Sequence, residues 1–340
     1  LMAKITEQTR SNYAAGLLRY AQFCDTLDIE EKDRFPVSQE RMAMFVTYQA
    51  GKGADAGHFV DGLRMWMLIN GVEWTRGPLV NAALGAHQNF VPEDARRPPR
   101  PPVTPEHLEA LRERLNFEDP MQCAVFAAAC VAFWGVCRLG EVIPSGGAFN
   151  SERHVARAAV KFERMEQAAN GMQTLMFHIP FDKVKKRAGA DIVLMNVKGK
   201  TSPIRALQWH LEVASPGLPG SAPLFAYVDT HASEGWSGLT RTRFLMTCDR
   251  VWRDAGLPAI PYGHSFRIGG TTEYLIKEMD PDRVMMLGRW SSKAFLRYWR
   301  RVEKIVPLWS TAHAEVERMT EVFAKAIVAF KKKHSIRNED

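Results

Sequence analysis

A proline-rich segment at residues 91–105, VPEDARRPPRPPVTP, limits how this chain can fold. It holds six prolines and three arginines. Because each proline fixes φ and lacks an N–H donor, neither a helix nor a central strand can run through it. The segment therefore predicts an extended, semi-rigid linker between two domains. We expect a first domain at 1–91, a linker at 92–105 and a second domain at 106–340.

Apolar residues in the first domain recur at spacings of three and four, which is typical of amphipathic helices. Ser38 is a plausible N-cap for one of them. The expected helices are residues 9–27, a helix that follows Ser38, 57–69 and 78–89. This pattern predicts a compact helical domain.

The second domain reads as mainly α with a small antiparallel β hairpin. Thr104 is placed to cap a helix that starts at Pro105. Residues 174–180 and 190–197 have strand character, and the basic loop FDKVKKRAG joins them. The expected helices are 121–137, 203–213, 241–255, 265–279, 281–288 and a final amphipathic helix at 310–332.

The run at 121–137, MQCAVFAAACVAFWGVC, is uncharged but shorter than the ~20 residues of a comfortable membrane span. It is better explained as a buried core helix of a soluble protein. Five cysteines without a CxxC pair argue against a disulfide framework and a zinc module. Cys123, Cys130 and Cys137 are expected to be reduced core thiols.

Positive charge is concentrated after residue 95. The formal net charge is +7 and the pI is about 9.2. Residues 1–95 carry 9 Lys and Arg against 12 Asp and Glu, whereas residues 96–340 carry 36 against 26. A basic second domain indicates a polyanionic partner. Lys4, Glu7 and Arg10 interrupt any apolar region near the start, so we expect an intracellular protein that is not secreted.

Several side chains could together perform phosphoryl-transfer chemistry. Two arginine forks can converge on one phosphate, and a histidine three residues before one arginine shares its helical face. A hairpin lysine can protonate a leaving alkoxide, and a tyrosine hydroxyl can attack. Taken singly, each candidate has a structural explanation: Arg138 as a helix cap, His264 as a turn or N-cap residue, the hairpin lysines as a solvated tip, and Trp290 and Tyr298 as core residues.

The ordered combination of motifs resembles the tyrosine recombinase (phage integrase) family. RLGE at 138–141 follows an apolar helix, and a lysine-bearing hairpin, HSFR at 264–267, LGRW at 287–290 and Tyr298 come after it. The resemblance covers about 105–305 by motif and extends to 1–95 by architecture, as a helical core-binding domain. The sequence segments FWGVCRLGE and LGRWSSKAFLRYWR are most similar to those of recombinases of eukaryotic mobile elements such as Cryptons.

The resemblance implies a role for each catalytic candidate. Arg138 and Arg267 clamp the scissile phosphate, and Glu141 orients Arg138. Lys183 protonates the departing 5′ oxygen, and His264 serves in acid–base chemistry. The remaining two roles are packing beside the phosphate by Trp290 and nucleophilic attack by Tyr298, which leaves a 3′-phosphotyrosyl link.

The chain departs from the family pattern in three places. The first is the interval from Trp290 to Tyr298, which is one residue shorter than usual; here Arg289, next to Trp290, could share its role. The second is the hairpin, which has three lysines, so that Lys185 or Lys186 could replace Lys183. The segment 145–170 is longer than expected. The candidates for contact with the DNA backbone are Arg96, Arg97, Arg100, Lys185, Lys186, Arg187 and Arg289.

We expect a site-specific recombinase that acts on double-stranded DNA as a homo-tetramer and is a monomer or dimer when alone, with no metal, ATP or other cofactor and no membrane partner. A type IB-like topoisomerase and a catalytically silent DNA-binding protein are the alternatives. We expect the protein to be located in the nucleus, or in the nucleoid if the source is prokaryotic. The helix at 310–332 could dock on its own core or on a neighbouring subunit.

Overall fold

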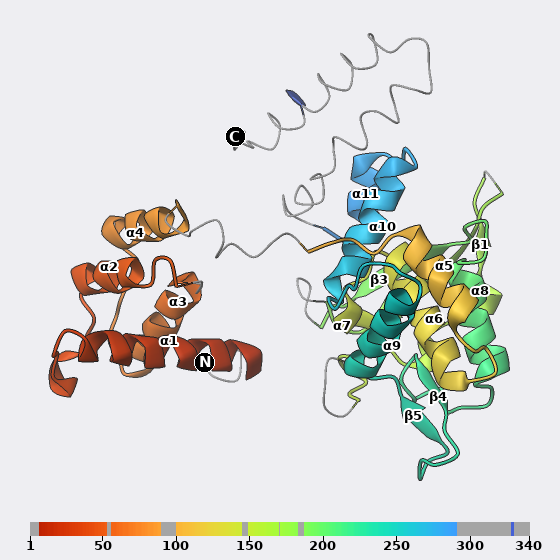
Figure 1. Cartoon of the computed structure of the whole chain (residues 1–340), viewed down its shortest axis with the longest axis horizontal. Coiled ribbons are helices and arrows are strands. Elements are labelled where there is room, and N and C mark those ends of the chain that lie inside the picture. Colours follow the sequence, from red (N-terminus) through yellow and green to blue (C-terminus); the bar gives the residue numbers. More distant parts are fainter. Residues whose placement is uncertain are drawn as a thin grey trace. The chain divides into compact units, whose positions relative to one another are not determined.

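A computed structural model describes residues 7–52, 56–89, 100–144, 149–169, 171–182, 187–290 and 328–329. The chain divides into two compact units, Leu1–Pro99 and Arg100–Asp340 (Figure 1).

The N-terminal unit is helical, as predicted. Its helices are α1 (Glu7–Asp25), α2 (Gln39–Tyr48), α3 (Ala56–Ile69) and α4 (Pro78–Asn89), with a short 3-10 turn, η2 (Glu31–Asp33), after α1. Ser38 caps α2, because its side chain accepts a hydrogen bond from the N–H of Arg41. The core is aromatic, and the rings of Tyr20 and Phe45 meet edge to face with centroids 5.4 Å apart.

The C-terminal unit combines helices with two small antiparallel sheets (Figure 1). Its α-helices are α5 (Pro105–Arg114), α6 (Pro120–Trp134), α7 (Leu139–Val142), α8 (Pro203–Gln208), α9 (Arg241–Asp254), α10 (His264–Ile276) and α11 (Pro281–Leu287). Short helical turns are η4 (Arg157–Ala159), η5 (Phe162–Arg164) and the π-helical η6 (Trp209–Ala214). The strands are β1 (Glu166–Gln167), β2 (Gln173–Ile179), β3 (Ala190–Met195), β4 (Ala226–Val228) and β5 (Trp236–Gly238).

Helix α6 lies at the centre of this unit and is buried along almost its whole length. Asp119 caps its first turn by accepting hydrogen bonds from two backbone N–H groups. The helix ends at Trp134, three residues earlier than predicted, because Gly135 follows and Val136 adopts a left-handed φ of 48°. The predicted core thiols are confirmed: Cys123, Cys130 and Cys137 are buried and free.

The predicted hairpin is present. Strand β2 pairs antiparallel with β3, in a register that sets Phe177 opposite Ile192. The inward side chains of both strands join the core, as the alternation of buried and exposed positions requires. Strand β1 extends this sheet, and β4 pairs with β5 in a second sheet; neither addition was predicted.

Two glycines let α10 approach its neighbours closely: Gly270 faces the backbone of α6, and Gly269 faces the backbone just before α5. A Cβ on Gly269 would lie 2.0 Å from the carbonyl oxygen of Val103, and one on Gly270 would lie 1.9 Å from that of Phe133. Only glycine fits at such a crossing, since any side chain would overlap backbone atoms. The contact brings Arg267 of α10 beside the chain that leaves α6.

The predicted helix at 310–332 lies outside the described residues, apart from the helical pair 328–329. Among the helices that the structure does describe, none has the length and apolar character to cross a membrane.

Candidate active site

Arg138 follows α6 and is the N-cap residue of the short helix α7. Its side chain is a quarter exposed, whereas that of Glu141 is 5% exposed. Glu141 Oε1 lies 2.7 Å from Arg138 Nη1, and Glu141 Oε2 accepts a hydrogen bond from the Arg138 N–H at 2.9 Å. One buried carboxylate therefore fixes both the backbone and the guanidinium of Arg138.

A second carboxylate, which is not among the predicted site residues, also holds Arg138. Asp182 Oδ2 lies 3.1 Å from Arg138 Nη1, and the Asp182 side chain is only 2% exposed. Asp182 stands immediately before the hairpin lysines. This ion pair joins the segment that follows β2 to the RLGE motif, 44 residues earlier in the chain.

Arg267 is fully buried in the first turns of α10. Its Nη1 donates to the carbonyl of Val136 at 2.7 Å, and its Nη2 donates to the carbonyl of Gly288. The ring of Trp290 covers the guanidinium, with 4.0 Å between Cζ and the ring centroid. Arg267 thus joins the segment after α6 to the LGRW motif, and Trp290 lies over it.

His264 is the first residue of α10 rather than its N-cap, which is Gly263. His264 and Arg267, three residues apart, therefore lie within one turn of the same helix, as predicted. Burial, followed by the positive charges of Arg267, Arg100 and Arg138, lowers the pKa of His264 to about 4. The imidazole is therefore neutral at pH 7.

Arg289 turns inward although it was a candidate for DNA contact. It adopts a left-handed φ of 58°, and its side chain is 8% exposed. Its Nη2 lies 2.7 Å from Glu141 Oε2, and its Nη1 donates to the carbonyl of Leu287 at 3.1 Å. In this structure the guanidinium is a buried partner of Glu141.

Of the remaining candidates, the structure describes Arg100 and Arg187. Arg100 lies with its guanidinium 5.4 Å from the ring centre of Tyr262, close enough to influence His264. Arg187 is exposed, 3.4 Å from Glu152. Six candidates lie outside the described residues: Arg96, Arg97, Lys183, Lys185, Lys186 and Tyr298.

Three guanidiniums and two buried carboxylates thus form one connected network. Arg138 and Arg289 share Glu141, and Arg289 and Arg267 share the carbonyl of Val136. The network keeps an excess of positive charge, because three cations face two anions. Paired guanidiniums suit a phosphate group, whose oxygens accept parallel hydrogen bonds.

A helical N-terminal unit, a helical second unit with a β hairpin, and arginines gathered at the end of the central helix define the tyrosine recombinase fold. The XerH site-specific recombinase, bound to a palindromic difH substrate in a post-cleavage complex, has this fold. It superposes with a TM-score of 0.54 at 16% identity, covering 88% of this chain and 79% of XerH.

The integrase of transposon Tn1549, in complex with transposon right end DNA, shares the fold as well. Its TM-score is 0.51 at 12% identity, and the match covers 93% of each chain. No protein-family model and no curated protein matches the sequence. The likeness therefore establishes the fold, and the similarity to Crypton recombinases stays a prediction.

Proposed function

We propose that this chain is a site-specific DNA recombinase that cuts and rejoins strands through a 3′-phosphotyrosyl intermediate. The observation that carries the proposal is the network in which Arg138, Glu141, Arg289 and Arg267 are joined at the end of α6. Two solved structures with this fold are a recombinase and an integrase bound to DNA, which supports the same class of substrate here.

The partly exposed Arg138 is the guanidinium that meets the scissile phosphate first. Glu141 and Asp182 hold it from behind, so little side-chain freedom is lost on binding. Arg267 adds positive charge from beneath Trp290. Charge fixed in a partly dry site stabilises a pentavalent phosphate more strongly than charge in water.

The cleavage step balances with residues of this chain. The phenol oxygen of Tyr298 attacks phosphorus and its proton passes to His264, which is neutral before the reaction. The bond from phosphorus to the 5′ oxygen breaks, and Lys183 protonates that oxygen. Attack by the 5′ hydroxyl of another strand reverses each transfer, so the phosphotyrosyl bond conserves the energy and no nucleotide is consumed.

We further propose that double-stranded DNA lies along the basic C-terminal unit, with Arg100 and Arg187 at its backbone. Strand exchange joins two cut duplexes, so the active assembly is a synaptic homo-tetramer. DNA affinity will fall steeply with salt, because phosphate contacts release counterions.

Three assays separate the candidate activities. In the first, the purified chain is incubated with nicked duplexes of randomised sequence. In the second it is incubated with supercoiled plasmid, and in the third its binding to DNA is measured by footprinting. A recombinase forms covalent adducts and joined products on a subset of sequences. Relaxation of plasmid without joined products indicates a topoisomerase, and a footprint without cleavage indicates a silent DNA-binding protein.

A further inference from the structure

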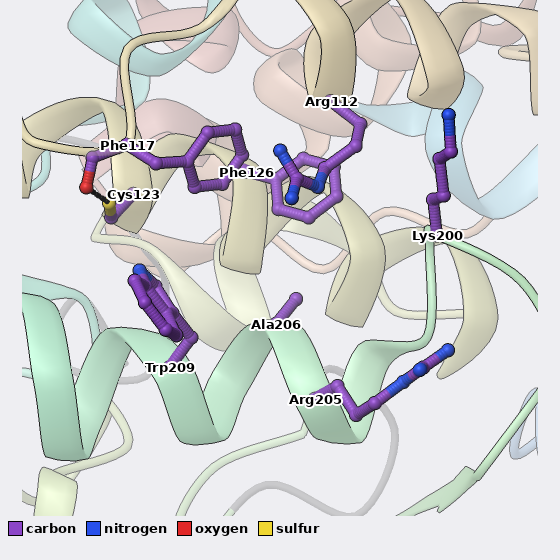
Figure 2. Close-up of a pocket in the computed structure, with 8 residues that line it drawn as sticks. All are labelled: Arg112, Phe117, Cys123, Phe126, Lys200, Arg205, Ala206 and Trp209. Atoms are coloured by element: carbon purple, nitrogen blue, oxygen red, sulfur yellow. Dashed lines mark hydrogen bonds between the residues drawn. The ribbon is translucent and has the colours of Figure 1, made fainter.

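A cavity of about 310 Å³ lies between the turn that joins α5 to α6 and the helix α8 (Figure 2). Its lining residues are Arg112, Phe117, Cys123, Phe126, Lys200, Arg205, Ala206 and Trp209. Cys123 and Phe126 belong to the first turns of α6, whereas Arg138 follows the last turn. The rise of the helix from Cys123 to Trp134 is ~16 Å, so this cavity is separate from the active site.

The cavity has an aromatic interior. Arg112 lies over Phe117, with 4.2 Å between its Cζ and the ring centroid. Trp209 is 47% exposed, and Figure 2 shows its indole at the opposite end of the cavity from Lys200. A large, half-exposed indole beside apolar walls is a typical anchor point for a bound side chain.

Three cations line the cavity without a carboxylate among the lining residues. Within the described ranges, Arg112, Lys200 and Arg205 make no ion pair. Arg205 donates to the carbonyl of Gly199. Asp119, which influences Cys123 from nearby, already accepts hydrogen bonds from Met121, Gln122 and the Gln122 side chain. The positive charge is therefore available to an anionic ligand.

The charges around the cavity favour a short acidic segment over a nucleic acid. Glu113 and Glu118 are exposed and follow directly after two lining residues. Carboxylates spaced along a peptide can reach the cations individually and stay away from these glutamates, whereas a nucleic acid carries a negative charge at every phosphate. The volume is at the lower end for ligand sites and suits one large side chain.

We propose that this cavity docks an acidic segment of a partner protein. One aromatic or large aliphatic side chain of that segment lies against Phe117 and Trp209, and flanking carboxylates bind Arg112, Lys200 and Arg205. The proposal is independent of the chemistry at Arg138.

Fluorescence anisotropy with the full chain tests the proposal. The probe is a labelled peptide with a central tryptophan flanked by glutamates; matched probes carry a central alanine, or lysines in place of the glutamates. The first peptide should bind at least about tenfold more tightly than either matched probe. Its affinity should fall as salt is added, because charges at a solvent-exposed rim are screened.

Variants locate the binding. Trp209→Ala and Lys200→Glu should each weaken the acidic peptide about tenfold or more. Arg164→Glu and Met246→Ala, at exposed positions outside the cavity, should leave it unchanged. Lys200→Glu keeps the test decisive if Trp209→Ala disturbs folding, since Lys200 is an exposed loop residue.

Three results would overturn the proposal. They are no binding of the acidic peptide, binding that survives both cavity variants, and tighter binding of a short single-stranded DNA at this cavity. The cavity variants should leave the amount of covalent DNA adduct unchanged, so this proposal and the proposed recombinase activity fail or succeed separately.

Discussion

Glu141 Oε2 lies 2.7 Å from Nη2 of Arg289, and both side chains are at most 8% exposed. Glu141 Oε1 meanwhile holds Arg138. Two motifs about 150 residues apart, RLGE and LGRW, are thus joined through a single carboxylate.

Removing that carboxylate should destabilise the C-terminal unit. Glu141→Ala leaves the buried charge of Arg289 without its partner, which costs about 3–5 kcal/mol. The control is Arg253→Ala, which breaks an ion pair with Asp249. Because the Arg253 side chain is 68% exposed, this change should cost less than about 1 kcal/mol. Urea unfolding of both variants measures the difference; equal losses would show that the buried pair has no special weight.

Arg138→Lys should abolish most activity while preserving the fold. A lysine keeps the charge but cannot present two parallel donors to a phosphate. We expect the rate of adduct formation to fall by about 10²–10³. Arg164→Lys, at an exposed position in η5, is the matched control and should stay within a few-fold of the wild type; a comparable fall in both would remove Arg138 from its assigned role.

Gly270→Ala should destabilise the C-terminal unit by about 3 kcal/mol, because its Cβ would overlap the carbonyl oxygen of Phe133. Gly85→Ala provides the contrast. Apart from the backbone of α4 itself, no atom of the described residues lies within 4 Å of that Cβ position, so alanine should stabilise the N-terminal unit by about 0.5–1 kcal/mol. Thermal unfolding measures both, and a harmless Gly270→Ala would contradict the close helix crossing.

Acid should destabilise the fold through His210. Burial, with a contribution from Arg157, lowers the pKa of His210 from 6.5 to about 3. The unfolded chain therefore takes up a proton first as the pH falls through 6.5, and stability is lost from there down to about pH 3. The loss at pH 4 is about 3 kcal/mol relative to pH 7.

His210→Phe should remove this part of the pH dependence, because phenylalanine keeps the ring packed on Phe225 without a titrating group. His231→Phe, at an exposed position, should not. The comparison uses the urea midpoints of unfolding at pH 7 and pH 4. If stability depends on pH as strongly in His210→Phe as in the wild type, other groups are responsible for the acid sensitivity.

Local pattern was sufficient to predict the longer helices of the described residues and the β2–β3 hairpin, since burial follows the periodicity of the sequence. It could not predict the inward turn of Arg289, which depends on a left-handed backbone and a carboxylate far along the chain. Asp182 was missed for a similar reason. Its role comes from Arg138, 44 residues earlier, rather than from its neighbours. The cavity at Trp209 was also missed, because three separate segments form it.

Mapping the covalent adduct tests the central claim most directly. Nicked duplexes of randomised sequence release a short fragment after cleavage, so the phosphotyrosyl enzyme accumulates and can be digested for mass spectrometry. We predict that the nucleotide is attached to Tyr298 and that Tyr298→Phe forms no adduct. Attachment to another residue, or an undiminished adduct with Tyr298→Phe, would contradict the account.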